Sequence, residues 1–584
     1  MKELKYLNHY FIKYRGRLLI GLIVTIIAAV FKLFVPIVIG DTLNIVEQYI
    51  NGDITDLAEV KSQLITNIIL IIGTTLLAAL FTFIMRQTII VVSRYIEFDL
   101  KNEVFNQYQR LSLSFYKQNR TGDLMSRISE DVSKVRMYTG PAVMYSTTTV
   151  TLFIVVISYM FYTAPILTLY AIAPLPILSV LIYRLSIAIH KRSTVVQQYL
   201  SKLTTYTQES FSGIAVIKAY GIEPRTNDGF VTLSEGSKDK NIDLAKVQAL
   251  FFPLMVLLIG ISNIAVIYVG GNQFIDGKID FGTIVEFLIY VNMLTWPVAI
   301  VGWVSSMIQQ AEASQKRINE FLKEEPAIKN RTTEATPIDG KIEFNNLSFV
   351  YPDTNITALK GVSFTVDPGE TLAIIGNTGS GKSTILELIG RLYDVEGSML
   401  MMDKTPLKEL NLDDLRGAIG YVPQDAFLFS DTIRNNIKFG KEDATDLEVI
   451  QAAKRAAVHK NIAGFSHGYD TILGERGITL SGGQKQRVSI ARAIIKDPQI
   501  LLFDDCLSAV DTETEEEILQ NLHQISATKT TIIVSHRVSS AKNADKIIIL
   551  DEGKVIQQGT HNELVNTDGY YKELYTKQLL EKEM

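Results

Sequence analysis

Long apolar runs distinguish the first half of the chain from the second, in which apolar and charged residues are mixed as in soluble proteins. Between Arg17 and Asp41 the only charged residue is Lys32, and the run from Met137 to Tyr183 contains none. A helix needs about 20 apolar residues to cross a hydrocarbon core about 30 Å thick, so the first run is long enough for one span. The second run is long enough for two, and Thr163-Ala164-Pro165 is the expected tip between them.

Six membrane spans are predicted in this way, and they form an all-α transmembrane domain over residues 1–322. In chain order the spans are 18–40, 62–92, 139–162, 165–187, 247–273 and 281–308. An even number of spans places both termini on one side of the membrane. The loops on that side are rich in Lys and Arg, so the termini and the second half of the chain are predicted to be cytoplasmic. The pattern indicates a multi-pass protein of the inner (plasma) membrane.

The cytoplasmic loops keep helical periodicity and lack clusters of Gly and Pro, so the helices are expected to extend beyond the bilayer. Ionisable residues inside spans indicate function by default. Lys32 falls near mid-membrane, where lining a polar substrate cavity and a snorkelling position without function are equally open. Arg86 and Glu286 lie nearer the span ends, where snorkelling or an interfacial position is favoured over a function. Asn292 and Trp296 are further cavity candidates by position.

Composition and charge narrow the class of protein. The chain has 57 Lys and Arg residues against 62 Asp and Glu residues, a net charge of −5 that gives no indication of a nucleic-acid partner. The single cysteine, Cys506, excludes an intramolecular disulfide and is interpreted as a core residue. A polar stretch with two prolines, residues 323–340, is the predicted linker to a soluble α/β domain over residues 341–584.

A phosphate-binding loop opens the α/β domain. The apolar strand Leu372–Ile375 runs directly into a glycine-rich loop that precedes a helix, which is the order such loops require. The glycines allow backbone N–H groups to surround phosphates, Lys382 offsets phosphate charge, and the Ser383 hydroxyl can ligate Mg²⁺. The predicted nucleotide-binding residues of the loop are Gly376, Asn377, Thr378, Gly379, Ser380, Gly381, Lys382, Ser383 and Thr384.

A second apolar strand, Ile500–Phe503, delivers Asp504 and Asp505 to its carboxyl end, where open α/β sheets hold their ligands. Together with the phosphate loop and the sequence LSGGQ at Leu480–Gln484, this segment resembles the ATPases of ATP-binding cassette (ABC) transporters. Over the whole chain, the order of six spans, linker and P-loop domain resembles an ABC exporter half-transporter of the multidrug or lipid type. The resemblance implies a transport-coupled ATPase with ATP and Mg²⁺ as cofactors.

Further positions match motifs of that family. Tyr351 resembles the aromatic residue that stacks on adenine, Gln424 the Q-loop glutamine, and His536 the switch histidine. GERG at Gly474–Gly477 and the D-loop sequence SAVD, which ends at Asp511, also match. Taken in this order and at this spacing, the matches indicate a complete ATP-binding domain.

The resemblance assigns roles to these residues. In the family each ATP lies between two such domains, so this chain is expected to pair with a second half-transporter. The signature residues that would contact the partner's ATP are Leu480, Ser481, Gly482, Gly483 and Gln484. The expected Mg²⁺ ligands are Ser383, Gln424 and Asp504, and the expected catalytic residues are Asp505, Gln424 and His536. The segments Phe115–Arg127 and Thr207–Gly221 resemble the coupling helices that connect ATP binding to the membrane.

One position departs from the family pattern. Asp505 stands where the family normally has glutamate, and the side chain is one methylene shorter. The carboxylate is therefore misplaced by about 1 Å, which can cost about 10²-fold in rate. Because the signature is intact, the sequence suggests the low-turnover subunit of a bacterial heterodimeric exporter, and a heterodimer is favoured over a homodimer.

Three functions remain open at this point. The leading one is export of lipophilic small molecules or drugs across the lipid bilayer. A lipid or lipopeptide flippase shares all of these motifs. An ATP-gated regulator or channel is the alternative of another class, since Asp505 allows ATP binding without rapid turnover.

Overall fold

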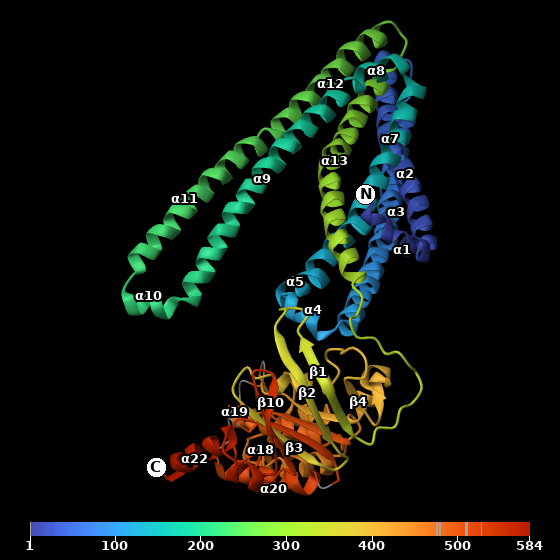
Figure 1. Ribbon diagram of the computed structural model, residues 1–584. Helices are drawn as coiled ribbons and strands as arrows, with labels where there is room; N and C mark the ends of the chain where they lie inside the picture. Colours follow the sequence, from blue (N-terminus) through green and yellow to red (C-terminus); the bar gives the residue numbers. More distant parts are fainter. Residues whose placement is uncertain (1, 475–476, 478–479, 508–511, 527, 584) are drawn as a thin grey trace. The chain divides into compact units, whose positions relative to one another are not determined.

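The computed structural model describes residues 2–474, 477, 480–507, 512–526 and 528–583 (Figure 1). It divides into two compact units. The first comprises Met1–Tyr108 and Gly122–Lys323, and the second comprises Gln109–Thr121 and Glu324–Met584. The second unit therefore includes a short helix from the first half of the chain, α4 (Leu113–Gln118).

The first unit is built from helices. In chain order they are η1 (Glu3–Leu7), α1 (Asn8–Lys13), α2 (Arg15–Asn51), α3 (Leu57–Arg110), α5 (Thr121–Ser126), η2 (Arg127–Asp131), α6 (Val132–Met137), η3 (Tyr138–Ala142), α7 (Val143–Thr163), α8 (Pro165–Ile172), α9 (Pro174–Ser212), α10 (Ile214–Tyr220), α11 (Glu223–Gln248), α12 (Phe251–Ile275) and α13 (Phe281–Leu322).

Six helical segments of the described chain are long and apolar enough to cross a membrane. They are Arg15–Asn51, Leu57–Arg110, Thr121–Thr163, Pro165–Ser212, Glu223–Ile275 and Phe281–Leu322. Each contains one of the six predicted spans, so the predicted number of spans is confirmed. The predicted tip is also confirmed, because α7 ends at Thr163 and α8 begins at Pro165.

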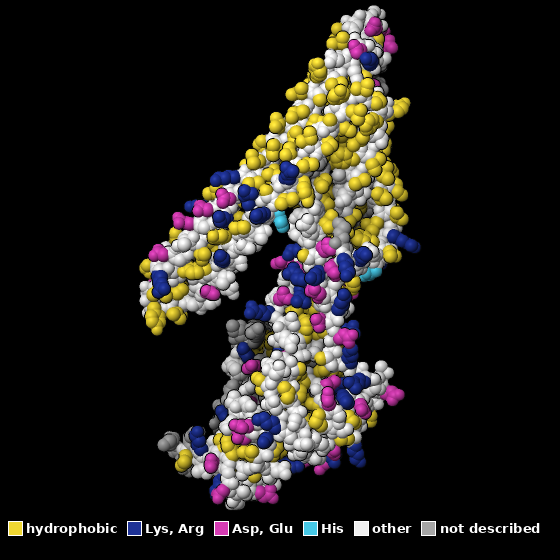
Figure 2. Space-filling view, turned by 45° about the horizontal axis from the view of Figure 1, so that its top comes forward, with side chains coloured by type: hydrophobic (Ala, Val, Ile, Leu, Met, Phe, Trp, Pro, Cys, Tyr) yellow, Lys and Arg dark blue, Asp and Glu magenta, His cyan; other side chains and the backbone are white. Residues whose placement is uncertain are grey.

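The helices are longer than a bilayer requires. The 54 residues of α3 span about 80 Å at about 1.5 Å per residue. Helices α9 and α11 run side by side and are joined at one end by α10 (Figure 1). Hydrophobic side chains cover much of the face of the first unit in Figure 2, and charged side chains gather toward the α10 end of this helix pair. The surface therefore changes from lipid-compatible to water-compatible along these helices.

Close packing between α2 and α13 depends on two glycines. A Cβ atom at Gly282 would overlap the carbonyl oxygen of Gly40, and one at Gly40 would overlap the Glu286 side chain. The backbone N–H of Gly282 donates to Asn44 Oδ1 at 2.6 Å. Glu286 is only 5% exposed. The prediction of an interfacial Glu286 is therefore corrected, because the glycines of the neighbouring helices leave space that buries its side chain.

The second unit combines two sheets with helices. Besides α4, its elements are β1 (Ile342–Val350), β2 (Thr357–Val366), β3 (Thr371–Gly376), α14 (Lys382–Ile389), β4 (Leu400–Met402), β5 (Thr405–Pro406), η4 (Leu407–Glu409), α15 (Leu412–Gly417), β6 (Ile419–Val422), α16 (Ile433–Lys438), α17 (Asp446–Arg455), α18 (His459–Ala463), η5 (Gly468–Asp470), α19 (Gly482–Ile494), β7 (Ile500–Asp504), α20 (Thr512–Ser526), β8 (Thr530–Ser535), β9 (Lys546–Asp551), β10 (Lys554–Gly559), α21 (His561–Asn566) and α22 (Tyr570–Glu583).

The larger sheet has the strand order β10-β9-β3-β8-β7-β6, and the smaller sheet has the order β2-β1-β4-β5. In the larger sheet β9, β3, β8, β7 and β6 are parallel, and only β10 is antiparallel. Strands β3, β7 and β8 are buried along their whole length, which explains their continuous apolar sequences. The predicted α/β fold class with an all-α membrane domain is confirmed.

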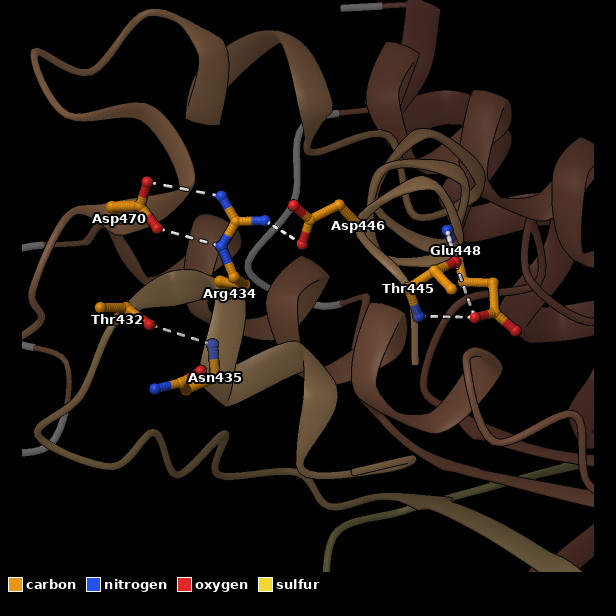
Figure 3. A network of polar contacts seen from close by, with 7 residues as sticks. All are labelled: Thr432, Arg434, Asn435, Thr445, Asp446, Glu448 and Asp470. Carbon is orange, nitrogen blue, oxygen red and sulfur yellow. Dashed lines mark hydrogen bonds and ion pairs between the residues drawn. The ribbon is translucent and has the colours of Figure 1, made fainter. Parts of the chain in front are cut away.

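A helical part of the second unit is stabilised by polar contacts at its surface (Figure 3). Arg434 of α16 donates from Nε to Asp470 at 3.0 Å and also pairs with Asp446 at the start of α17. Thr445 and Glu448 form a reciprocal capping box at the N-terminus of α17. These contacts connect α16, α17 and η5.

Candidate functional site

The predicted site residues come together because four parallel strands end at one edge of the larger sheet. Strand β3 ends at Gly376, β6 at Val422, β7 at Asp504 and β8 at Ser535. Ile375 pairs with Ser535, and Asp504 pairs with Val534. Neighbouring strands lie about 4.8 Å apart. The phosphate loop, the paired aspartates and His536 therefore share the edge at which open α/β sheets hold ligands.

The phosphate loop has the backbone that its glycines predict. Gly381 has a φ of +99°, and a Cβ atom there would approach the carbonyl oxygen of Ala358 to 2.5 Å. The Ser380 hydroxyl is buried and has no hydrogen-bond partner. Helix α14 begins directly after the loop, at Lys382. A buried unpaired hydroxyl, a cradle that admits only glycine, and a helix N-terminus together fit the phosphates of a nucleotide.

Lys382 lies over this loop. Its Nζ donates to the carbonyl oxygens of Gly376 at 2.9 Å and Asn377 at 2.8 Å, and the side chain is buried. Burial lowers the pKa of Lys382, and the charges of Asp505 and Asp504 partly oppose this effect. The loop carbonyls offer the Lys382 ammonium only partial negative charge. A bound phosphate would offer it a full negative charge.

Ser383 and Asp504 are joined directly. The Ser383 hydroxyl donates to Asp504 Oδ1 at 2.9 Å, across more than a hundred residues of sequence. Burial raises the pKa of Asp504, whereas the hydrogen bond from Ser383 lowers it. A hydroxyl and a carboxylate are the oxygen ligands that Mg²⁺ prefers, so this pair fits a magnesium ion.

Asp505 follows the end of β7 in a left-handed backbone conformation, with a φ of +43°. Its backbone N–H donates to the carbonyl oxygen of Val534 at 2.9 Å, which fixes the residue to β8. Burial raises the pKa of the Asp505 carboxyl, and the neighbouring His536 lowers it. For His536 the effects have the opposite signs: burial and Lys382 lower its pKa, and Asp505 raises it. The carboxylate, imidazole and ammonium groups thus act on one another.

Gln424 follows β6, the parallel neighbour of β7, at the same sheet edge, whereas the signature lies at the start of α19. Gln424 is two residues beyond the end of β6 and is exposed; in the described part of the chain its side chain makes no hydrogen bond. Ser481 is the N-cap of α19, accepting from the backbone N–H of Gln484 at 3.3 Å and donating its own N–H to Gln484 Oε1 at 3.0 Å. The exposed start of α19 therefore presents Ser481 and the Gly482 amide to solvent.

Tyr351 makes contacts that its motif did not reveal. Its hydroxyl lies 2.8 Å from both Thr384 Oγ1 and Glu387 Oε2, and its ring meets Tyr393 edge to face at 5.2 Å. Within the same unit, Lys117 of α4 places Nζ 5.2 Å from the Tyr351 ring and 3.4 Å from Glu387 Oε1. The sequence around Lys117 resembles a coupling helix, but no sequence pattern indicates that Lys117 pairs with Glu387 and Tyr351.

Other predicted positions are less informative. Cys506 is 2% exposed in an apolar cluster of the second unit, as expected of a core residue, and burial raises its thiol pKa. Asp511, with the rest of SAVD, lies outside the described residues, as do Glu475 and Arg476 of GERG.

Comparisons with known proteins add independent findings. The chain matches the family "ABC transporter transmembrane region" over residues 18–298 and the family "ABC transporter" over residues 359–508. It is 34% identical to the multidrug resistance-like ATP-binding protein MdlA of Escherichia coli, over 100% of this chain and 97% of the relative. It is 36% identical to an ATP-dependent lipid A-core flippase of Syntrophus aciditrophicus, over 83% of this chain and 80% of the relative. A solved bacterial Atm1-family ABC exporter with ATP bound matches with a TM-score of 0.79 and 27% identity, over 97% of this chain and 98% of that one.

Proposed function

Because the chain belongs to the ABC transporters, as an exporter of the multidrug or lipid-flippase type, we propose that it moves lipophilic molecules outward as one half of a dimer. The chain is a multi-pass membrane protein whose ATP-binding domain couples ATP hydrolysis to transport. The observation that carries the proposal is the assembly of Lys382, Ser383, Asp504 and His536 at one sheet edge.

Each side chain at this edge has a task in ATP hydrolysis. Lys382 and the loop amides hold the β- and γ-phosphates, and Tyr351 stacks on adenine. His536 contacts the γ-phosphate, and the neutral imidazole favoured by its lowered pKa can still donate one hydrogen bond. Phosphoryl transfer requires positioning and charge neutralisation more than covalent chemistry, and this arrangement supplies both.

Magnesium fits beside Ser383 and Asp504, and the exposed Gln424 is a third candidate ligand. When bound, the ion would neutralise phosphate charge. What the chain itself contributes is the 2.9 Å pairing of hydroxyl and carboxylate, which presents both oxygens together.

Asp505 makes this chain's own site slow. A carboxylate one methylene short of the usual position orients the attacking water poorly, although ATP binding is unaffected. The intact signature, with Ser481 at the start of α19, serves the site of a partner half-transporter that has glutamate. We therefore favour a heterodimer with two unequal sites over a homodimer.

The experiment that tests this proposal compares ATPase rates in reconstituted vesicles. The chain alone is compared with the chain together with a candidate partner half-transporter that has glutamate at the position matching Asp505. We expect rapid, substrate-stimulated hydrolysis only for the pair. A homodimer that hydrolyses ATP at ordinary transporter speed would contradict the heterodimer, while leaving the transporter assignment intact.

The orientation of the chain in the membrane follows from the distribution of Lys and Arg among its loops. The loops rich in Lys and Arg place both termini and the ATP-binding domain in the cytoplasm, and the membrane is the inner (plasma) membrane. Cysteine-labelling with a membrane-impermeant reagent checks this, after a single cysteine is placed in the loop at Asp53 or Asp276. We expect labelling of intact cells at these positions and none at a cysteine placed at Lys572.

A further inference from the structure

A cavity of about 650 Å³ lies among three helices of the first unit, α2, α3 and α13. On α3 the lining residues Ala78, Thr82 and Arg86 recur every four positions, as one face of a helix does. Ile289 and Met293 line it from α13 with the same spacing. The size is typical of a small-molecule site, and most of the wall is apolar.

Two cationic side chains lie in this otherwise apolar lining. Lys32 of α2 and Arg86 of α3 are the only ionisable residues among the described ones that line the cavity. Neither forms a hydrogen bond or an ion pair with another residue of the described chain. Both charges line the same cavity, and like charges in an apolar surrounding repel each other. Since Lys32 lies near the middle of an apolar stretch, an uncompensated charge there is costly.

A bound anion would resolve both problems at once. It would neutralise two repelling cations, and the Arg86 guanidinium can hold a phosphate or carboxylate through two parallel hydrogen bonds. The apolar wall at Ile289 and Met293 would accept a hydrocarbon body. A cationic amphiphile would instead add a third positive charge to the cavity.

We propose that this cavity binds amphiphilic anions, with the anionic headgroup between Lys32 and Arg86 and the hydrocarbon part along α13. As a statement about the transported substrate, this rests on the proposed function. As a statement about binding, it stands on the cavity alone.

The test measures binding without ATP to the full-length protein, together with its partner half-transporter. Two fluorescent probes share one alkyl chain and differ in the headgroup, phosphate in one and trimethylammonium in the other. We expect the alkyl phosphate to bind at least about tenfold more tightly, since each charge-assisted contact contributes a factor of about ten or more. Competition with inorganic phosphate separates a lipid-like ligand from a free anion.

Variants locate the site. Lys32→Gln and Arg86→Gln should each weaken alkyl phosphate binding about tenfold, and Lys32→Arg should retain it. The matched control is Lys61→Gln, which removes a lysine from α3 outside the cavity lining and should have no effect. Unchanged ATP binding by each variant shows that the protein is folded.

The outcomes separate the two proposals. Equal alkyl phosphate binding by the wild type and the Lys32→Gln/Arg86→Gln variant would overturn the site, and so would tighter binding of the trimethylammonium probe. Displacement by inorganic phosphate at the same concentration as alkyl phosphate would overturn the amphiphile assignment. Probe binding that depends on Lys32 and Arg86 in a protein that transports nothing would support the site and contradict the proposed function.

Discussion

The position of Asp505 is fixed by its backbone, and the length of its side chain decides how far the carboxylate reaches. Its N–H is bonded to β8 and its φ is positive, so a longer side chain at this position would start from the same point and reach further toward the phosphates. We therefore expect Asp505→Glu to raise the ATPase rate of this chain's own site by as much as about 10²-fold. Single-turnover hydrolysis in the assembled pair is the measurement.

The control for this prediction is Asp504→Glu, which lengthens the neighbouring carboxylate. Because Asp504 is already bonded to the Ser383 hydroxyl at 2.9 Å, the extra methylene should displace it and lower activity. An Asp505→Glu variant with unchanged turnover would mean that the slow-site hypothesis is wrong.

His536 gives a pH dependence whose sign follows from its surroundings. Burial and Lys382 lower its pKa in the folded protein below the ordinary 6.5. Below pH 6.5 the unfolded state therefore binds more protons than the folded state, and the free energy of unfolding falls as the pH falls toward the folded pKa. Above pH 6.5 this contribution is constant. In His536→Asn without nucleotide, the thermal unfolding temperature should decline less between pH 6.5 and pH 5.

His561 is the matched control. Its pKa is also lowered, by burial and by Lys542, but it lies at the start of α21 and bonds Tyr571. His561→Asn should flatten the same stability curve and leave ATP hydrolysis unchanged, whereas His536→Asn should abolish single-turnover hydrolysis at this chain's own site. Loss of activity in both variants would contradict a specific role for His536.

Among single residues, the sequence predicts those whose chemistry depends on a local motif. Lys382 and Ser383 follow from the glycine loop, and the structure places them as the motif requires. Lys117 could not be found in this way. Its contact with Glu387 joins residues separated by 270 positions, and only the packing of α4 in the second unit brings them together.

Among the elements, α17 and α19 begin in the same way and differ in what they serve. Thr445 and Ser481 each form a capping box with the residue three positions later. Replacing either by alanine should cost about 1 kcal/mol in the free energy of unfolding. Only Ser481→Ala should also slow ATP turnover in the assembled pair, because only the start of α19 is proposed to face the partner's ATP. Denaturant unfolding and ATPase assays on both variants check this.

Helix α4 provides a second prediction about a single element, through the contact of Lys117 with Tyr351 and Glu387. Lys117→Met keeps the length of the side chain but removes the charge from above Tyr351 and from Glu387. A partly exposed contact of this kind contributes about 0.5 to 1 kcal/mol, so the Kd for ATP at this chain's own site should rise about two- to fivefold. Binding of inorganic triphosphate, which has no adenine, should be unaffected. The exposed Lys460 of α18 is the control, and an equal effect of Lys460→Met would refute the contact's role.

The elements themselves were largely predictable, since periodicity and a proline tip define spans and the turn at Ala164. Periodicity could not show which helices touch. Glu286 reads as a span-end charge, and it is buried only because Gly40 and Gly282 allow α2 and α13 to approach. In the same way, the sequence of α3 does not show which of its faces lines a cavity. The cavity that contains Lys32 forms only because α2 packs beside α3.

For the whole molecule, the proposed difference between the two ATP sites predicts that they are unequally occupied by ATP. If the signature of this chain completes the partner's fast site while Asp505 slows its own, ATP remains in one site through several turnovers of the other. That retained ATP keeps the two ATP-binding domains associated and shifts the population toward the closed pair. The transporter would then need only one hydrolysis to reopen, which limits the ATP used for each transported molecule.

Nucleotide trapping measures this directly. The pair is loaded with labelled ATP in the presence of substrate, quenched, separated from free nucleotide and analysed by chromatography. We expect about one ATP for each ADP in the wild type. Asp505→Glu should replace that ATP by ADP, whereas Ser481→Ala should leave ATP in both sites, because it disables the opposite one. Equal conversion at both sites of the wild type would show that Asp505 positions water as well as glutamate does, and the molecule would then be a symmetric transporter in its chemistry.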